Sequence, residues 1–274
     1  MRKSKYLSLI LAATLCMTAC TDRKKPASHG LLDNDSTLMA EGISFDTLSL
    51  TIHNNLIEGR ETPSYDIQVV MPFAQGESQL AQTINKTINE EFLKSEALLP
   101  RQAMQNYADS LQRMFKEEMA EYYDPDEEIP FSEYTWFVSG DISKNSRPGC
   151  IAYSFYVETY LGGPHGSHDI YYLNIDSKTG RRLSKADVFK PEMEEELLKA
   201  ITQRLAQDNG CRNREELLEK TGITMLGDIY VEQNFTLEAE GITFVYNTYE
   251  IASYAEGTIS VFLPNEELKD FIKL

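Results

Sequence analysis

The stretch from Tyr153 to Phe189 constrains the fold of this chain more than any other part of the sequence. Apolar and polar residues alternate before and after a glycine-rich loop, a pattern typical of two half-buried strands. Lys178-Thr179-Gly180 predicts a tight turn after the second strand, and Ser184 predicts the start of a helix. The stretch therefore predicts a hairpin within a sheet, followed by a helix.

The same criteria predict strands and helices along most of the remaining sequence. Strands are expected at about 43–52, 67–71, 134–142, 235–237, 242–246 and 258–263, and helices at 78–92, 100–119, 191–205, 215–220 and 265–272. Short turns between strands, as within 235–246, favour antiparallel pairing. We therefore predict an α+β fold of antiparallel sheets with helices packed on one side. Two closely associated subdomains are expected, at 43–145 and 146–274.

The first nineteen residues predict a signal peptide. Arg2, Lys3 and Lys5 precede an apolar run that is too short to span a bilayer. Small residues before Cys20 are typical of a bacterial lipoprotein signal, in which that cysteine receives a lipid with acyl chains such as palmitate. The alternative is an ordinary secretory signal cleaved near Ala19. Residues 20–42 are polar and predict a flexible tether, so the membrane is an expected partner through the N-terminal lipid.

The segment that follows Cys20 indicates which compartment the lipid-anchored protein faces. Residues 21–25 contain no acidic run after the lipid site, which favours a periplasm-facing anchor in the cell envelope. Removal of the signal and lipidation of Cys20 leave only Cys150 and Cys211 as thiols. They can form a disulfide or stay free, because pairing requires Cα atoms within about 7 Å.

The net charge limits the classes of partner. The chain carries −17, and removal of the three cationic signal residues leaves −20. Such a surface repels the phosphates of nucleic acid, which we therefore exclude as a partner. It attracts a cationic protein at a rate that falls with added salt. The alternative is that the acidity only keeps the protein soluble.

The loop at 162–169 is the strongest candidate for chemistry. The ligand-binding candidates are four residues of this loop and the tyrosines on either side of it: Tyr160, Gly162, Gly163, His165, His168 and Tyr172. Two imidazoles three residues apart, next to Asp169, could contribute to a metal-dependent hydrolase, but a third ligand would have to be a carboxylate from elsewhere. The glycines favour a structural loop in which His165 bonds to backbone and fixes the turn. We therefore expect no metal site, no cofactor and no catalytic residue.

Other candidate sites are weaker. The acidic segment 124–128 lacks the alternating oxygen ligands and central glycine of a calcium loop. Nucleophile motifs and phosphate-binding loops are absent, and carboxylates are too numerous for any pair to be chosen. Several tyrosines are candidates for contact with a protein or a sugar, or are half-buried strand residues: Tyr156, Tyr160, Tyr172, Tyr249 and Tyr254.

Several segments resemble a known family. The Gly-Gly-x-His-Gly loop at 162–166, the turn at 176–180, Tyr249-Glu250-Ile251-Ala252 and Glu256-Gly257 resemble the C-terminal domain of unknown function in RsiV-type proteins. That family includes the extracellular part of a lysozyme-responsive anti-sigma factor and the non-catalytic part of some peptidoglycan deacetylases. Residues 65–72 and 84–85 resemble the domain that usually precedes it. The resemblance covers about 45–274.

This resemblance implies an extracellular α+β binding module. The transmembrane helix of the anti-sigma factors and the polysaccharide-deacetylase domain are missing from this sequence, so signalling and deacetylation are not implied. We expect a lipid-anchored, non-catalytic envelope protein that binds lysozyme or another cationic protein. The alternatives are binding of peptidoglycan fragments and a metal-dependent envelope hydrolase that uses the 162–169 loop.

Overall fold

The structure is a computed structural model that describes residues 38–60, 62–124 and 133–273. These residues belong to one compact unit. The predicted signal peptide, Cys20, most of the predicted tether and residues 125–128 of the acidic segment lie outside the described residues. Within the described part of the chain, no helix has both the length and the hydrophobicity needed to cross a membrane.

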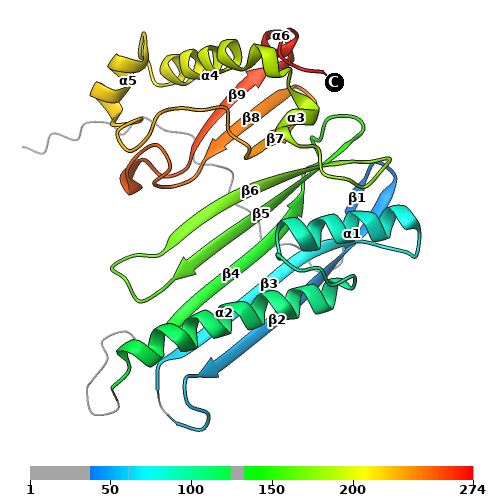
Figure 1. Ribbon diagram of the computed structural model, residues 1–274, viewed down its shortest axis with the longest axis vertical. Coiled ribbons are helices and arrows are strands. Elements are labelled where there is room, and N and C mark those ends of the chain that lie inside the picture. Colours follow the sequence, from blue (N-terminus) through cyan, green and yellow to red (C-terminus); the bar gives the residue numbers. More distant parts are fainter. Residues whose placement is uncertain (1–37, 61, 125–132, 274) are drawn as a thin grey trace, which may run out of the picture. The chain divides into compact units, whose positions relative to one another are not determined.

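Six strands form one sheet in which the spatial order follows the chain order, from β1 at one edge to β6 at the other (Figure 1). The strands are β1 (Leu38–Ala40), β2 (Ile43–Asn55), β3 (Ser64–Ala74), β4 (Glu133–Ile142), β5 (Cys150–Tyr160) and β6 (Ser167–Asp176). Buried and less buried residues alternate along β4, as expected where only one face of a sheet is covered. Neighbouring strands are antiparallel except β3 and β4, which are parallel.

Two helices connect β3 to β4, and a connection of this length allows the parallel pair. They are α1 (Gln79–Glu91) and α2 (Pro100–Tyr122), and both cover the same face of the sheet (Figure 1). Ser78 caps α1, because its hydroxyl oxygen accepts a hydrogen bond from the Ala81 N–H at 3.1 Å. Pro100 occupies the first turn of α2, where its missing N–H is not needed.

The rest of the chain builds a second sheet with short helices around it. The strands are β7 (Phe235–Leu237), β8 (Gly241–Tyr246) and β9 (Ile259–Pro264), all antiparallel. The helices are α3 (Lys185–Val188), α4 (Glu194–Asp208), α5 (Arg214–Thr221) and α6 (Asn265–Leu268), with short 3-10 turns at Pro191–Met193 and Tyr254–Glu256. Gly222 ends α5 in a left-handed conformation, with φ of 74°, as its place after the helical pattern predicts.

Each sheet has its own buried cluster. The first cluster lies between the six-stranded sheet and the pair α1 and α2, and it contains the single tryptophan, Trp136. The second joins the three-stranded sheet to α4, whose buried face is formed by Leu197, Ile201 and Leu205. Because β5 pairs with β4 and β6 pairs with β5, the first sheet continues across the predicted subdomain boundary at 145–146. The boundary itself stays a prediction.

Asparagine side chains occupy the free edge of β6. The Asn234 side chain accepts a hydrogen bond from the Tyr172 N–H at 2.8 Å and donates one to the Ile170 carbonyl at 2.8 Å. The Asn247 side chain accepts from the Ile170 N–H at 2.9 Å. These amides stand where a further strand would pair, and they attach the segments before β7 and after β8 to the first sheet.

Asn174 makes the reciprocal connection from β6 to β7. Its buried amide donates to the Phe235 carbonyl and accepts from the Leu237 N–H, both at 2.8 Å. The two sheets are therefore joined by polar groups that replace a strand ladder.

The α+β prediction is confirmed, with the parallel pair as an addition to the expected antiparallel sheets. Two local expectations are corrected. The last residues of the predicted tether, 38–42, instead form β1 and a turn. Glu41 and Gly42 both have positive φ, and this turn closes a hairpin between β1 and β2. The last helix ends at Leu268 instead of extending to about Ile272, since Ile272 forms a bridge with Phe189.

Candidate functional site

Three aromatic rings, which we call the aromatic stack, lie together at the tip of the β5–β6 hairpin: His165 from the hairpin loop, and Tyr249 and Tyr254 from the connection between β8 and β9. The rings of His165 and Tyr254 stack at a centroid distance of 3.9 Å, and Tyr249 lies 6.0 Å from Tyr254. The Tyr254 hydroxyl donates to the Gly166 carbonyl at 3.1 Å, and His165 Nδ1 lies 3.0 Å from the same oxygen. The loop histidine is thus held by a backbone contact, the kind expected of a structural loop, and by a ring contact that the sequence did not predict.

Tyr249 gives the aromatic stack an exposed end. Tyr249 is 55% exposed, and its φ is 71°, a left-handed backbone conformation that residues other than glycine rarely adopt. The next residue is Glu250, whose carboxylate accepts a hydrogen bond from the Tyr230 hydroxyl at 3.3 Å. An exposed tyrosine in a strained backbone beside a carboxylate is a candidate contact residue.

The remaining loop candidates lie at separate positions within this hairpin and do not form one site. Gly162 has a φ of 74°, a conformation that favours glycine in the turn. His168 faces Glu158 across the β5–β6 ladder, and its ring lies 6.3 Å from that of Tyr156. Tyr160 and Gly163 lie in the same hairpin.

Neither a metal group nor a disulfide involves the predicted residues. Among the residues that the structure describes, no group of three or more His, Cys, Asp or Glu side chains is arranged to hold a metal ion. Cys150 and Cys211 are both free and buried. Burial raises the pKa of the Cys150 thiol to about 12, so it stays protonated at neutral pH.

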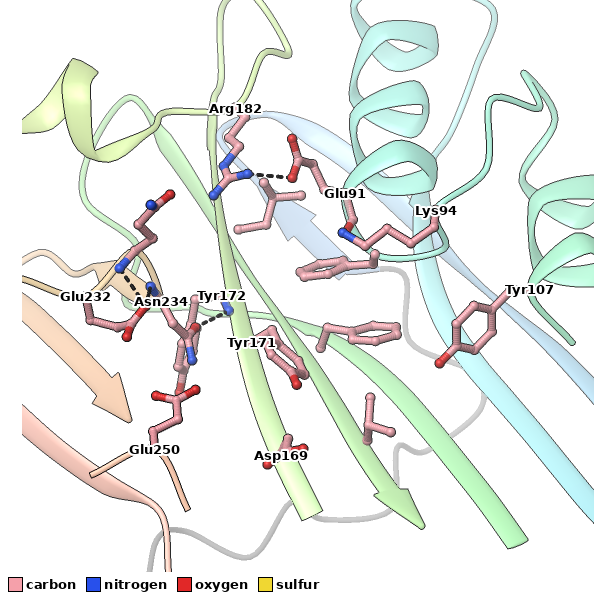
Figure 2. A pocket seen from close by; sticks show the side chains of 15 residues that line it. Glu91, Lys94, Tyr107, Asp169, Tyr171, Tyr172, Arg182, Glu232, Asn234 and Glu250 are labelled. Carbon is pink, nitrogen blue, oxygen red and sulfur yellow. Dashed lines mark hydrogen bonds and ion pairs between the residues drawn. The ribbon is translucent and has the colours of Figure 1, made fainter. Parts of the chain in front are cut away.

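A second candidate site, which we call the acidic cleft, lies beside the hairpin on the helix-covered face of β5 and β6. Its volume is about 550 Å³, within the range of roughly 300–1,000 Å³ that small-ligand sites occupy. Its walls come from β6, the α1–α2 connection, the turn after β6 and the segments at 232–234 and 250 (Figure 2). Two of the predicted residues, Asp169 and Tyr172, line it.

Aromatic and aliphatic side chains form the floor of the acidic cleft. Phe92 and Phe155 stack at 4.6 Å, and Tyr107 meets Phe155 edge-on at 6.4 Å. Val157 and Tyr171 continue this surface along β5 and β6. Burial raises the pKa of Tyr171 to about 12, and the negative charge of Asp169 adds to the effect, so its hydroxyl stays protonated and can donate.

Glu232 is the most buried carboxylate of the cleft, with only 8% of its surface exposed. Its Oε1 atom accepts hydrogen bonds from the Gln233 N–H at 2.7 Å and the Asn234 N–H at 3.0 Å. Its Oε2 atom is buried and has no hydrogen-bond partner among the described residues. Because Asn234 is itself bonded to β6, the carboxylate is held in a fixed position.

Asp169 and Glu250 bring two further carboxylates to the same side of the cleft (Figure 2). Burial raises the pKa of Asp169 above its ordinary value. Burial also raises the pKa of Glu250, and the negative charges of Glu232 and Asp169 raise it further. Among the described residues, no salt bridge joins these three carboxylates to a lysine or arginine. Their charges therefore remain available to a ligand.

The opposite side of the cleft carries cations. Arg182 pairs with Glu91 at 2.6 Å, and Figure 2 shows this pair apart from the three carboxylates. Gly180 brings this turn onto α1: its φ is 73°, and a Cβ there would lie 3.0 Å from the backbone nitrogen of Ile84. Lys94 donates to the Glu91 carbonyl at 2.6 Å.

Sequence reasoning missed most of the cleft residues, in particular Lys94, Arg182 and Glu232. They are scattered among 26 basic and 43 acidic residues, and no spacing distinguishes them. Glu250 was within a segment that carried the family resemblance, which was the only signal for it. Tyr171 lies in a predicted strand, but the sequence indicates its neighbour Tyr172 as the candidate.

Comparisons with known proteins agree with the sequence resemblance. Residues 186–266 match the family model described as "Protein of unknown function (DUF3298)", and residues 58–168 match the model described as "Deacetylase PdaC". The predicted resemblance, to a domain of unknown function shared with non-catalytic parts of deacetylases, is thereby confirmed. A comparison with curated proteins found no match.

Two solved structures share the fold. A member of the DUF3298 family from Bacteroides fragilis superposes with a TM-score of 0.74 at 23% identity, over 85% of this chain and 94% of the other. A DUF3298 family protein from Pseudomonas aeruginosa gives a TM-score of 0.57 at 12% identity, over 84% and 94%. At these identities the likeness establishes the fold.

Proposed function

We propose that this protein is a lipid-anchored binding protein of the bacterial cell envelope that captures a cationic protein such as lysozyme, without catalytic turnover. The observation that carries the proposal is the aromatic stack, with exposed Tyr249 next to the carboxylate of Glu250. Tyrosine is among the side chains that contribute most to the affinity of protein interfaces. The resemblance to RsiV-type domains, stated from the sequence, supports the same class of partner.

Electrostatics support a cationic partner. The chain carries −17, and the carboxylate of Glu250, next to Tyr249 in the chain, has no salt bridge to a lysine or arginine among the described residues. Complementary charge raises the association rate and orients the partner, while the tyrosines supply the buried contact area. Such binding weakens with salt but does not vanish, because the aromatic contacts are insensitive to screening.

The rival function, a metal-dependent envelope hydrolase, would use His165, His168 and Asp169. His165 instead makes its contacts with Tyr254 and the Gly166 carbonyl, which favours a structural role for this ring. Binding of peptidoglycan fragments remains the second candidate, since stacked aromatic rings also suit sugar rings. Deacetylase is the name of a matched family model, and we assign no deacetylation to this chain.

The test is calorimetric titration of the purified chain with lysozyme at low and at physiological salt, with a neutral protein of similar size as control. We expect saturable one-to-one binding that weakens with salt and persists at physiological ionic strength. Binding that disappears at physiological salt would mean that acidity alone attracts lysozyme, and the proposal would fail.

A variant locates the interface. Tyr249→Asn removes the ring but introduces a residue that tolerates positive φ, so the backbone conformation is preserved. We expect its affinity for lysozyme to fall at least about tenfold, the size of a typical interface anchor. Met114→Ala removes a 52% exposed side chain on α2 and is the matched control, which should bind like the unmodified chain. Equal affinity of both variants would exclude the aromatic stack.

A further inference from the structure

The acidic cleft has two ends of opposite charge. Figure 2 shows Asp169, Glu232 and Glu250 on one side and Lys94 and Arg182 on the other, with apolar rings between. Charged groups of both signs could neutralise one another by direct pairing, but no salt bridge among the described residues crosses the cleft. The separation therefore leaves two charged ends that a ligand can bridge.

Glu232 shows that the acidic end is a built site rather than a cluster of surface charges. Its side chain is 8% exposed, and its buried Oε2 atom lacks a hydrogen-bond partner among the described residues. A buried carboxylate oxygen without a donor is unfavourable, and a ligand that donates a hydrogen bond removes the penalty. The Tyr230 hydroxyl donates to Glu250 and also lies next to the Glu232 carboxylate: burial raises the pKa of Tyr230, and its interactions with Glu232 and Glu250 raise that pKa further.

The chemistry of the acidic end favours an organic cation. The described residues include no group of three or more His, Cys, Asp or Glu side chains that could coordinate a metal ion, so these three carboxylates are spread too widely for one ion. An ammonium group carries three donors and can bond to Glu232 while it remains close to the other two. The Tyr171 hydroxyl, bonded to Asp169, lies at the same end.

Lys94 makes the opposite end suitable for an anion. It has no carboxylate partner among the described residues and donates only to the Glu91 carbonyl. Its φ is 50°, a left-handed conformation in which glycine would be less strained. Arg182 adds a guanidinium whose charge is shared with Glu91. Together these groups leave one net positive charge, enough for a single carboxylate.

The middle of the acidic cleft is apolar. Phe92 and Phe155 are buried and stacked, and Val157 extends the surface along β5. Burial also raises the pKa of Tyr107, which borders this floor, so its hydroxyl stays neutral. An aliphatic spacer between two charged ends fits this surface, because its methylene groups lose contact with water on binding.

We infer that the acidic cleft binds a zwitterionic small molecule, with its ammonium group at Glu232 and its carboxylate toward Lys94. A long amino acid and a short peptide with free ends share this chemistry. The inference goes beyond the proposed function, since it concerns a different ligand and depends on Glu232 and Lys94, which lie outside the aromatic stack, although Glu250 borders both sites.

The test uses matched probes with the full chain, followed by calorimetry or ligand-observed NMR. The ω-amino acids 4-aminobutanoate, 6-aminohexanoate and 8-aminooctanoate carry both charged ends at increasing spacing. Hexylamine and hexanoate each carry one end, and trialanine carries both ends on a peptide spacer. We expect at least one two-ended probe to bind at least about tenfold more tightly than either one-ended probe. Preference for trialanine identifies a peptide, and preference for an ω-amino acid identifies a single long chain.

Two variants assign the ends. Glu232→Gln should reduce the affinity for the best two-ended probe and for hexylamine at least about tenfold. Lys94→Met keeps the length of the side chain and should lower the affinity for the two-ended probe to that of hexylamine. Glu219→Gln and Lys178→Met change exposed charges elsewhere and should have no effect. Thermal unfolding of each variant checks that the fold is retained.

Three results would overturn the inference: no probe binds, hexylamine binds as tightly as the best two-ended probe, or Lys94→Met leaves the two-ended probe unaffected. None of them bears on lysozyme binding, which Tyr249→Asn tests separately. Failure of the cleft and failure of the aromatic stack are therefore distinguishable.

Discussion

Lys94 at the acidic cleft and Tyr249 in the aromatic stack both adopt left-handed backbone conformations, with φ of 50° and 71°. Such conformations cost about 1–3 kcal/mol each for a residue with a side chain, and surrounding structure must hold them. Charge adds a second local cost, because burial raises the pKa of Asp169 and of Glu250. At the scale of single residues, both candidate sites therefore contain side chains or backbone conformations that lower the stability of the folded chain.

Asp169 allows this cost to be measured. Its pKa is higher in the folded chain than in the unfolded chain, so the folded state binds a proton more readily. Stability is consequently lost as pH rises from the ordinary carboxyl value through the raised one, and it is regained at lower pH. Asp169→Asn should raise the free energy of unfolding at pH 7 by at most about 1 kcal/mol, the scale for partly exposed charges.

Urea denaturation at neutral pH and below about pH 4, where the carboxyl is protonated in both states, measures the difference. The gain should vanish at the lower pH. Asp109→Asn, at an exposed position on α2, is the control. A gain of equal size at both pH values would mean that the charge of Asp169 is not the cause.

At the scale of elements, the joint between β6 and the second sheet positions the acidic cleft. Asn234 bonds to the edge of β6, and the adjoining Glu232 is thereby placed over that strand. Side-chain amides carry a donor and an acceptor in the spacing of a peptide group, so they can substitute for a strand at an edge. The same exchange at Asn174 fixes β7.

Asn174→Leu tests this joint. The substitution removes both bonds and leaves the Phe235 carbonyl and the Leu237 N–H without partners in a buried position. We expect the free energy of unfolding to fall by about 2–4 kcal/mol, from two unsatisfied groups. Asn54→Leu, at an exposed position in β2, should change stability by less than about 0.5 kcal/mol. Equal effects in denaturant titrations would show that the amide joint is unimportant.

At the scale of the whole molecule, the described residues form one compact unit that contains two hydrophobic cores. The first core holds Trp136, and the second holds Cys211. The buried asparagine joint connects them without a linker, because β6 belongs to the first sheet and contacts the second. Two cores joined in this way should unfold together.

Trp136 and Cys211 provide one reporter for each core. We expect the fluorescence of Trp136 and the labelling of Cys211 by a thiol reagent to show the same denaturant midpoint. A Cys150→Ala variant leaves Cys211 as the buried thiol that reports on the second core. Midpoints that differ well beyond experimental error would indicate independent domains, in agreement with the predicted division at 145–146.

The sequence by itself determined most of the elements and several of their ends, apart from β1 and the end of the last helix. Alternation and helical spacing located the strands and helices, and Ser78, Ser184 and Gly222 marked helix ends that the structure confirms. These features depend on neighbours within a few residues, so they can be read from the chain directly. The family resemblance, which extended that reasoning to the whole fold, is also confirmed.

Only the tertiary structure decided which side chains meet. The acidic cleft draws on residues from Glu91 to Glu250, and its carboxylates are a few among 43 acidic residues. Nothing in their local sequence separates Glu232 from the rest, because its burial and its unpaired oxygen arise from the docking of one segment on the edge of β6. A site formed by long-range contacts has no short-range pattern, whereas a helix cap has one.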